Sequence, residues 1–179
     1  MRPPLFRFAC LCLLSIAPTT LQAADPAKAD TLAALRAAAS RVPAWAEQKD
    51  LYRRFNAVEL YGLIDGGAVE YQKQGLIGGI FVSLTKGARL SEIYLEDFGS
   101  PARAVGMVEI KRQSFNAAKG VPGLEAVAAV YVAVIGGCVV YWAKGAYYFE
   151  MTLTGYDSSD DAARDTVILV TVMSAAIPK

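Results

Sequence analysis

The stretch "AVAAVYVAVIGGCVVYWAKGAYYFEMTLTG", residues 126–155, decides the fold class. It contains three runs rich in valine and aromatic residues, which favour β-strands. The Gly136–Gly137 pair between the first two runs predicts a two-residue hairpin turn, and "AKGA" at residues 143–146 predicts a second turn. The stretch therefore predicts three antiparallel strands that follow one another along the chain.

The first part of this stretch also has the composition of a short membrane span. Residues 126–143 carry no charge, and their number is marginal for a helix that crosses a bilayer. Their β-branched and aromatic content favours a buried hairpin instead, because strands covered on both faces read as continuous apolar runs. We therefore expect no stable membrane span in the mature chain.

Alternation along the strands predicts which residues face the core. In the third run the residues expected to point inward are Tyr147, Phe149, Met151 and Leu153, and those expected to point outward are Tyr148, Glu150, Thr152 and Thr154. Upstream, residues 80–84 and 90–97 predict another hairpin around "TKGAR". In its second strand, Glu92 and Glu96 alternate with apolar residues, which predicts one buried face and one solvated face.

Residues 56–75 are predicted to form one helix. Asn56 and Glu59 have the spacing of a capping box, and Gly75 is a natural C-terminal stop. The Gly66–Gly67 pair interrupts this pattern at a cost of about 1 kcal/mol per glycine. The pair could break the helix, form an anion-binding backbone nest, or allow close packing on the sheet. Because the apolar face continues through the glycines, we expect at least one of them to contact a strand.

Two further helices are predicted near the sheet. Ser100 suits an N-cap and Pro101 suits the first helical position of "PARAVGMVEIKRQ". Acidic residues 157–161 suit the N-terminus of a final helix, although the later "TVILVTV" is also compatible with a strand. We therefore expect an α+β fold, with an antiparallel sheet of about five strands and helices packed against it. Residues 93–106 and 151–165 resemble each other, which leaves open a degenerate duplication.

The N-terminal segment predicts export. Arg2 and Arg7 precede an apolar core, and small residues follow, which is the order of a secretory signal peptide at residues 1–23. Without it, 16 basic and 17 acidic residues remain, a net charge of −1 that does not favour nucleic-acid binding. Residues 24–50 are predicted to be an alanine-rich, weakly packed lead-in, and residues 51–179 a single domain in the periplasm or outside the cell.

Residue types exclude several chemistries. The chain has no histidine, and Cys138 is the one cysteine outside the signal segment, so we expect a buried, inert thiol. The acidic runs do not form a calcium loop, and the glycine-rich pieces match neither a P-loop nor a dinucleotide fingerprint. Glu96 and Asp97 are neighbours on a predicted strand and point to opposite faces, so they do not pair as acid and base. We therefore expect no metal and no cofactor.

Three motifs resemble a known family. They are "LYGLIDGGAVEYQKQG", "EIYLEDFGSPARAVGMV" and "VYWAKGAYYFEMT", which together span about residues 55–155. The chain is similar in these motifs to bacterial secreted or envelope proteins grouped as domain of unknown function 6599. The resemblance implies an exported domain and assigns no activity.

The sequence predicts an exported accessory or binding domain that is not catalytic. The candidate ligand-binding residues are Asp65, Gly66, Gly67, Asp97, Trp142 and Tyr148. One alternative is a hydrolase that uses Asp65 or Asp97. Another is a carrier that holds a small apolar or carbohydrate-like ligand between Trp142 and Tyr148. The partner is an unidentified protein or small molecule.

Overall fold

A computed structural model describes residues 26–64, 67–115, 119–121, 123–124 and 128–177, so the predicted signal segment lies outside it. The strands are β1 (Ala46–Glu47), β2 (Arg53–Asn56), β3 (Gly78–Lys86), β4 (Arg89–Asp97), β5 (Ala128–Val134), β6 (Gly137–Lys144) and β7 (Tyr147–Thr154). The helices are α1 (Pro26–Ala39), α2 (Ala68–Gln74), α3 (Pro101–Ser114) and α4 (Ser159–Ala175), with short 3-10 helices η1 (Lys49–Leu51) and η2 (Glu59–Gly62).

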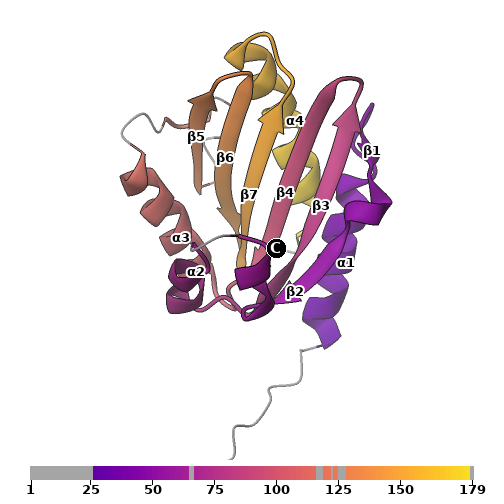
Figure 1. The fold of residues 1–179 in the computed structure, drawn as a ribbon. Helices are drawn as coiled ribbons and strands as arrows, with labels where there is room; N and C mark the ends of the chain where they lie inside the picture. Colours follow the sequence, from indigo (N-terminus) through magenta and orange to yellow (C-terminus); the bar gives the residue numbers. More distant parts are fainter. Residues whose placement is uncertain (1–25, 65–66, 116–118, 122, 125–127, 178–179) are drawn as a thin grey trace, which may run out of the picture.

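These strands form a seven-stranded antiparallel sheet in the order β1-β3-β4-β7-β6-β5, with β2 also paired to β3. Helices α1 and α4 lie behind the sheet in Figure 1, and α2 and α3 lie against the lower part of its front face. The predicted α+β class is confirmed, with more strands than the five expected. The additional strands β1 and β2 are short, and their sequences have no clear alternation.

The predicted hairpins are present. β5 pairs with β6 and β6 pairs with β7, both antiparallel. The first turn differs in detail from the prediction, because Ile135 and Gly136 form it and Gly137 already belongs to β6. Gly136 has a φ of 73°, which favours glycine at that position. Within the described residues, no helix has the length and apolarity needed to cross a membrane.

A main core fills the space between the sheet and helices α1 and α4. It includes Phe149, Met151 and Leu153, as the alternation of β7 predicts. The weak packing expected for the alanine-rich segment is wrong, because Leu35 and Ala39 of α1 are fully buried in this core. Small alanine side chains allow a helix to approach its neighbours closely, so a thin apolar stripe is sufficient here.

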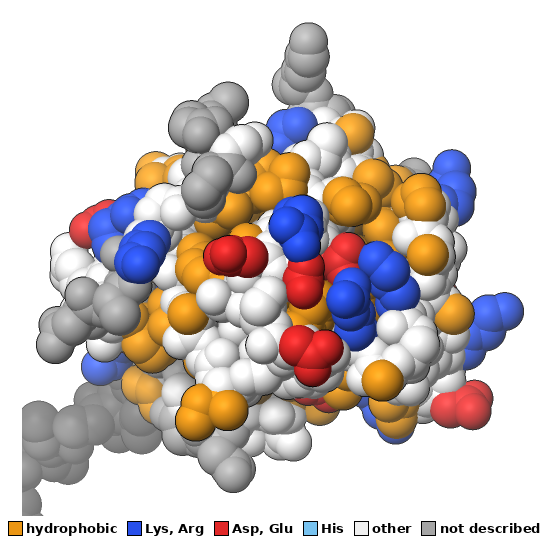
Figure 2. All heavy atoms as spheres, turned by 90° about the horizontal axis from the view of Figure 1, so that it is seen from above, with side chains coloured by type: hydrophobic (Ala, Val, Ile, Leu, Met, Phe, Trp, Pro, Cys, Tyr) orange, Lys and Arg blue, Asp and Glu red, His pale blue; other side chains and the backbone are white. Residues whose placement is uncertain are grey.

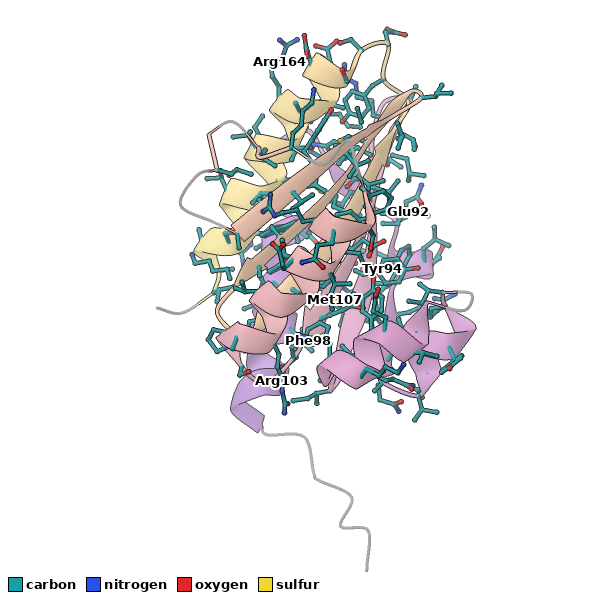
Figure 3. All side chains as sticks on the ribbon, turned by 90° about the vertical axis from the view of Figure 1, so that its left-hand side faces the viewer. Glu92, Tyr94, Phe98, Arg103, Met107 and Arg164 are labelled. Atoms are coloured by element: carbon teal, nitrogen blue, oxygen red, sulfur yellow. The ribbon has the colours of Figure 1, made fainter. Side chains whose placement is uncertain are left out.

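A second core lies between the front face of the sheet and helices α2 and α3. Its residues include Tyr71, Phe98, Met107, Tyr141 and Tyr148. Figure 3 shows Phe98 and Met107 on the opposite side of the sheet from α4. Tyr148 was expected to point outward into solvent, but it is fully buried because the helices cover this face.

The predicted helix over residues 56–75 is wrong. The capping box forms as expected, since the backbone N–H of Asn56 donates to Glu59 at 2.9 Å and that of Glu59 donates to Asn56 at 3.0 Å. However, Asn56 ends β2, and the box precedes the short η2. A separate helix, α2, begins at Ala68 and ends at Gln74, and its C-cap residue Gly75 has a left-handed φ of 92°. Two separate helices, η2 and α2, therefore replace the single predicted helix, and Gly67 is the N-cap residue of α2.

The two similar segments, residues 93–106 and 151–165, have the same local structure but pack differently in the fold. Both proposed units contain a strand followed by a serine-capped helix: Ser100 precedes α3 and Ser158 precedes α4. The C-terminal "TVILVTV" is helical, which excludes its strand alternative. The two strands, β4 and β7, are antiparallel neighbours. A true duplication would relate them by a two-fold axis perpendicular to the sheet, and this axis would place both helices on the same face of the sheet. Because α3 and α4 lie on opposite faces, the resemblance is confined to local structure.

We predict that Cys138 is inert in the folded protein. Its side chain is fully buried beside Thr166, with the sulfur 3.5 Å from the hydroxyl oxygen, and burial raises the pKa of the thiol. A thiol reagent should therefore label the mature protein only after unfolding in urea. Cys138→Ala should keep the fold at a cost of about 1 kcal/mol. Rapid labelling of the native protein would contradict this placement.

Candidate functional site: a carboxylate–tyrosine cluster

Pairing of the two central strands brings together residues that are far apart in the sequence. In the β4–β7 register Tyr94 is opposite Glu150, and Glu96 is opposite Tyr148. Since all four positions share one face of the sheet, their side chains lie beneath or beside α2 and α3. We call the set formed by Tyr71, Tyr94, Glu96, Lys111, Tyr141, Tyr148 and Glu150 the carboxylate–tyrosine cluster.

Tyrosine hydroxyl groups hold one carboxylate of the cluster. The Tyr71 hydroxyl donates to Glu150 Oε2 at 2.5 Å, and the Tyr148 hydroxyl lies 3.4 Å from the same oxygen. The Tyr71 and Tyr148 rings pack edge to face with centroids 6.1 Å apart, and both contact Phe98. Burial and the nearby glutamates raise the pKa of both tyrosines, so the phenols stay protonated and act as donors.

Glu96 is the other carboxylate, and one of its oxygens is buried without a hydrogen-bond donor among the described residues. Its side chain is 1% exposed, and no described residue forms a hydrogen bond with its Oε2 atom. Burial and then the charge of Glu150 raise the pKa of Glu96 well above its ordinary value, while the charge of Lys111 lowers it. The solvated face predicted for β4 is therefore wrong at this position. A buried carboxylate in this state strongly favours a proton or a cation beside it.

Lys111 of α3 supplies the positive charge. Its ammonium lies 4.7 Å from the centre of the Tyr71 ring and 5.8 Å from that of Tyr141. It also lies 3.4 Å from Glu70 on α2. Phe115 stacks on Tyr141, with the ring centroids 5.8 Å apart. The cluster thus has the composition of a site that binds a cation between aromatic faces and carboxylates.

Replacement of Glu96 by glutamine tests this electrostatic picture. Because folding raises its pKa, Glu96 contributes most to stability below its ordinary pKa of 4.5, and the contribution declines as the pH rises above that value. Glu96→Gln should therefore be more stable than the wild type at mildly alkaline pH, by about 1–3 kcal/mol. The advantage should be lost near pH 4.5.

Urea unfolding at the two pH values measures the difference. Glu92→Gln is the matched control, since Glu92 lies on the same face of β4 but is partly exposed. An equal effect of Glu96→Gln at both pH values would contradict the prediction, because it would mean that folding does not change the protonation of Glu96.

The residues predicted from the sequence do not form one site. Trp142 and Tyr148 are on opposite faces of the sheet: Trp142 stacks on Phe149 in the main core, and Tyr148 belongs to the second core. They therefore cannot hold a ligand between them. Tyr148 alone lies in the carboxylate–tyrosine cluster.

The other predicted residues lie outside the cluster. Asp97 is buried at the end of β4, and its Oδ1 accepts a hydrogen bond at 2.7 Å from the backbone N–H of Gly99 in the turn that leads to α3. Gly67 is exposed at the start of α2, so the expected contact with a strand is not present there. It lines a groove between α2 and α3. Asp65 and Gly66 lie outside the described residues.

Six of the seven residues of the carboxylate–tyrosine cluster are not among the site residues predicted from the sequence. The sequence places Tyr71 on a helix face and Glu150 on the outward face of its strand, and it places Glu96 on a solvated face beside Asp97. It assigns no site role to Tyr94, Lys111 or Tyr141. The useful signal was the outward alternation of glutamates and tyrosines in β4 and β7. Among the described residues, no three His, Cys, Asp or Glu side chains converge in a way that could hold a metal ion.

Comparison with known proteins supports the fold. No family model and no curated protein matches the chain. Among solved structures, the chain is similar to the extracellular domain of PknH from Mycobacterium tuberculosis, with a TM-score of 0.52 and 11% sequence identity. The match covers 82% of this chain and 95% of that domain. At this level of identity the similarity establishes a shared fold and does not transfer a ligand or a partner.

Proposed function

We propose that this protein is an exported accessory domain that binds a small molecule at the carboxylate–tyrosine cluster and does not catalyse a reaction. The observation that carries the proposal is Glu96, a buried carboxylate whose Oε2 has no hydrogen-bond partner among the described residues. Such a group is costly to stability, and unsatisfied buried polar groups in native proteins commonly have a functional reason.

Export is supported by two independent observations. The order of Arg2, Arg7, an apolar core and small residues is that of a secretory signal peptide. A protein with a similar fold is an extracellular domain. The resemblance to domain of unknown function 6599 supports the same location, and we propose membership of that family on the three sequence motifs alone.

The alternative functions have less support. A hydrolase that uses Asp97 would need this carboxylate free to meet a substrate, yet Asp97 is buried and bonded to the turn before α3. A carrier that uses Trp142 and Tyr148 together is excluded by their opposite faces. A carrier that holds its ligand at the front face of the sheet, without Trp142, is the function proposed above.

Isolation from the native host tests the proposal. The protein from the envelope or secreted fraction should start after Ala23 or Ala24 on N-terminal sequencing, and denaturation should release a small molecule detectable by mass spectrometry. Glu150→Gln should lose this molecule, because it removes the charge that Tyr71 and Tyr148 orient. Glu109→Gln, on the exposed side of α3, is the matched control and should retain it. An intact Met1, or an empty protein in all three forms, would contradict the proposal.

A further inference from the structure

The environment of Lys111 is that of a bound ammonium ion. Its side chain is 16% exposed, and its charged end lies near the faces of Tyr71 and Tyr141 and beside Glu70. Aromatic rings attract cations through the negative potential of their faces, and a nearby carboxylate adds to this attraction. The position that Lys111 occupies is therefore also suited to the ammonium group of a ligand.

One lysine does not satisfy the acidic groups around it. Glu70 pairs with Lys111 directly, Glu150 accepts from Tyr71, and Glu96 keeps an oxygen without a partner among the described residues. Lys111 is the cation whose charge acts on Glu96. The cluster thus has more carboxylates than resident cations, which favours the binding of additional or replacement positive charge.

A groove lies next to this position and shares Glu70 with it. It lies between α2 and α3 with a volume of about 530 Å³, and it is lined by Gly67, Val69, Glu70, Lys73, Gln74 and Ile110. Glu70 belongs to both places, because it lines the groove and contacts the Lys111 ammonium. Val69 and Ile110 give the groove apolar walls that could hold the hydrocarbon part of a ligand.

We propose that the groove and the carboxylate–tyrosine cluster bind an organic cation whose ammonium group takes the place of the Lys111 ammonium. This inference rests on the proposed ligand-binding function and gives it a ligand class. In the free protein Lys111 fills the site, and in the complex its flexible side chain turns out into solvent. The ligand has a primary or quaternary ammonium group and a small apolar body.

Acetylation of the wild-type chain tests the displacement directly. Tetramethylammonium chloride is the probe, because it carries the charge and does not react with acetic anhydride. Acetylation of Lys111, followed by peptide mass spectrometry, should become several-fold faster in its presence than in sodium chloride of equal ionic strength. Lys49, which is exposed in η1 and does not line the groove, is the internal control and should react at the same rate in both. An unchanged rate at Lys111 would overturn the proposal.

Removal of the resident ammonium provides a second test. Lys111→Ala should bind tetramethylammonium about tenfold more tightly than the wild type, because the competing charge is gone. Lys111→Met serves if the alanine variant does not fold, since methionine keeps the apolar stem. The added change Glu96→Gln or Glu150→Gln should abolish the gain. Equal stabilisation by the uncharged analogue tert-butanol would indicate a simple apolar cavity and would overturn the proposal.

The two levels of inference can fail separately. If a small molecule without a positive charge is released from the native protein, the binding function stands and the organic-cation assignment is wrong. If tetramethylammonium displaces Lys111 but no small molecule accompanies the native protein, the cation site stands and the proposed binding function is contradicted.

Discussion

Trp142→Ala is expected to lower the free energy of unfolding by about 3–5 kcal/mol, because the indole is fully buried in the main core. Its ring stacks on Phe149, with centroids 4.4 Å apart and an angle of 7° between the planes. The change removes this contact and leaves a cavity in the middle of the sheet, where the backbone cannot collapse to fill it. Urea unfolding of the wild type and the variant measures the loss.

Two other variants control for the position and the chemistry. Trp142→Phe keeps a ring beside Phe149 and removes an indole N–H that has no partner among the described residues, so it should cost less than alanine. Ile168→Ala changes an exposed residue of α4 and should alter stability by no more than about 0.5 kcal/mol. If Trp142→Ala costs no more than Ile168→Ala, the core assignment is wrong and a ligand role for Trp142 returns.

Local features of the fold could be predicted from the sequence because short-range physics determines them. The turns around Gly136 and Gly145 and the serine caps of α3 and α4 depend on residues within a few positions of one another. Strand alternation also determined which residues of β7 share a face. These features identified an antiparallel α+β domain without knowledge of the strand order.

The candidate site could not be predicted because it depends on non-local pairing. Glu96 and Glu150 meet only when β4 lies beside β7, and the intervening chain contains α3, β5 and β6. Nothing in the alternation of either strand selects that neighbour. The burial of Glu96 requires in addition that α2 and α3 cover the front face, where the sequence pattern indicated solvent.

The predicted helix over residues 56–75 failed for a different reason. Its apolar positions at Tyr61, Ile64, Ala68 and Tyr71 have the spacing of a continuous helix, which favours one helix despite the two glycines. In the structure Tyr61 is exposed while Ala68 and Tyr71 are buried, so the four positions do not share one face. The local cost of glycine was the better guide.

Asp165→Ala is expected to cost about 3 kcal/mol or more, because it leaves two cations facing an empty position. The carboxylate is 6% exposed and accepts from Lys86 at 2.8 Å and from Arg89 at 2.9 Å. The Tyr156 hydroxyl donates to it at 2.9 Å. These contacts join α4 to the β3–β4 hairpin at the upper end of the molecule, where Figure 2 shows acidic and basic side chains close together.

The pH dependence of Asp165→Asn provides an independent check. Burial by itself raises the pKa of Asp165, but the hydrogen bonds from Lys86 and Tyr156 and the charge of Lys86 hold it below its ordinary value of 3.8. A lowered pKa stabilises the folded state above that value, and the contribution is lost as the pH falls further. The difference in stability between the wild type and Asp165→Asn should therefore be full at neutral pH and shrink below pH 3.8.

An exposed ion pair serves as the control for Asp165→Ala, because it shows how much stability is lost when a carboxylate that is not buried is removed. Glu109 and Arg112 on α3 are paired at 3.1 Å, but their side chains are 52% and 41% exposed. Glu109→Ala should change the free energy of unfolding by no more than about 0.5 kcal/mol, because water replaces the partner. If Asp165→Ala is equally mild, its carboxylate is solvated and α4 is not held to the β3–β4 hairpin by charge. A large loss that grows smaller in acid is the outcome that the buried network requires.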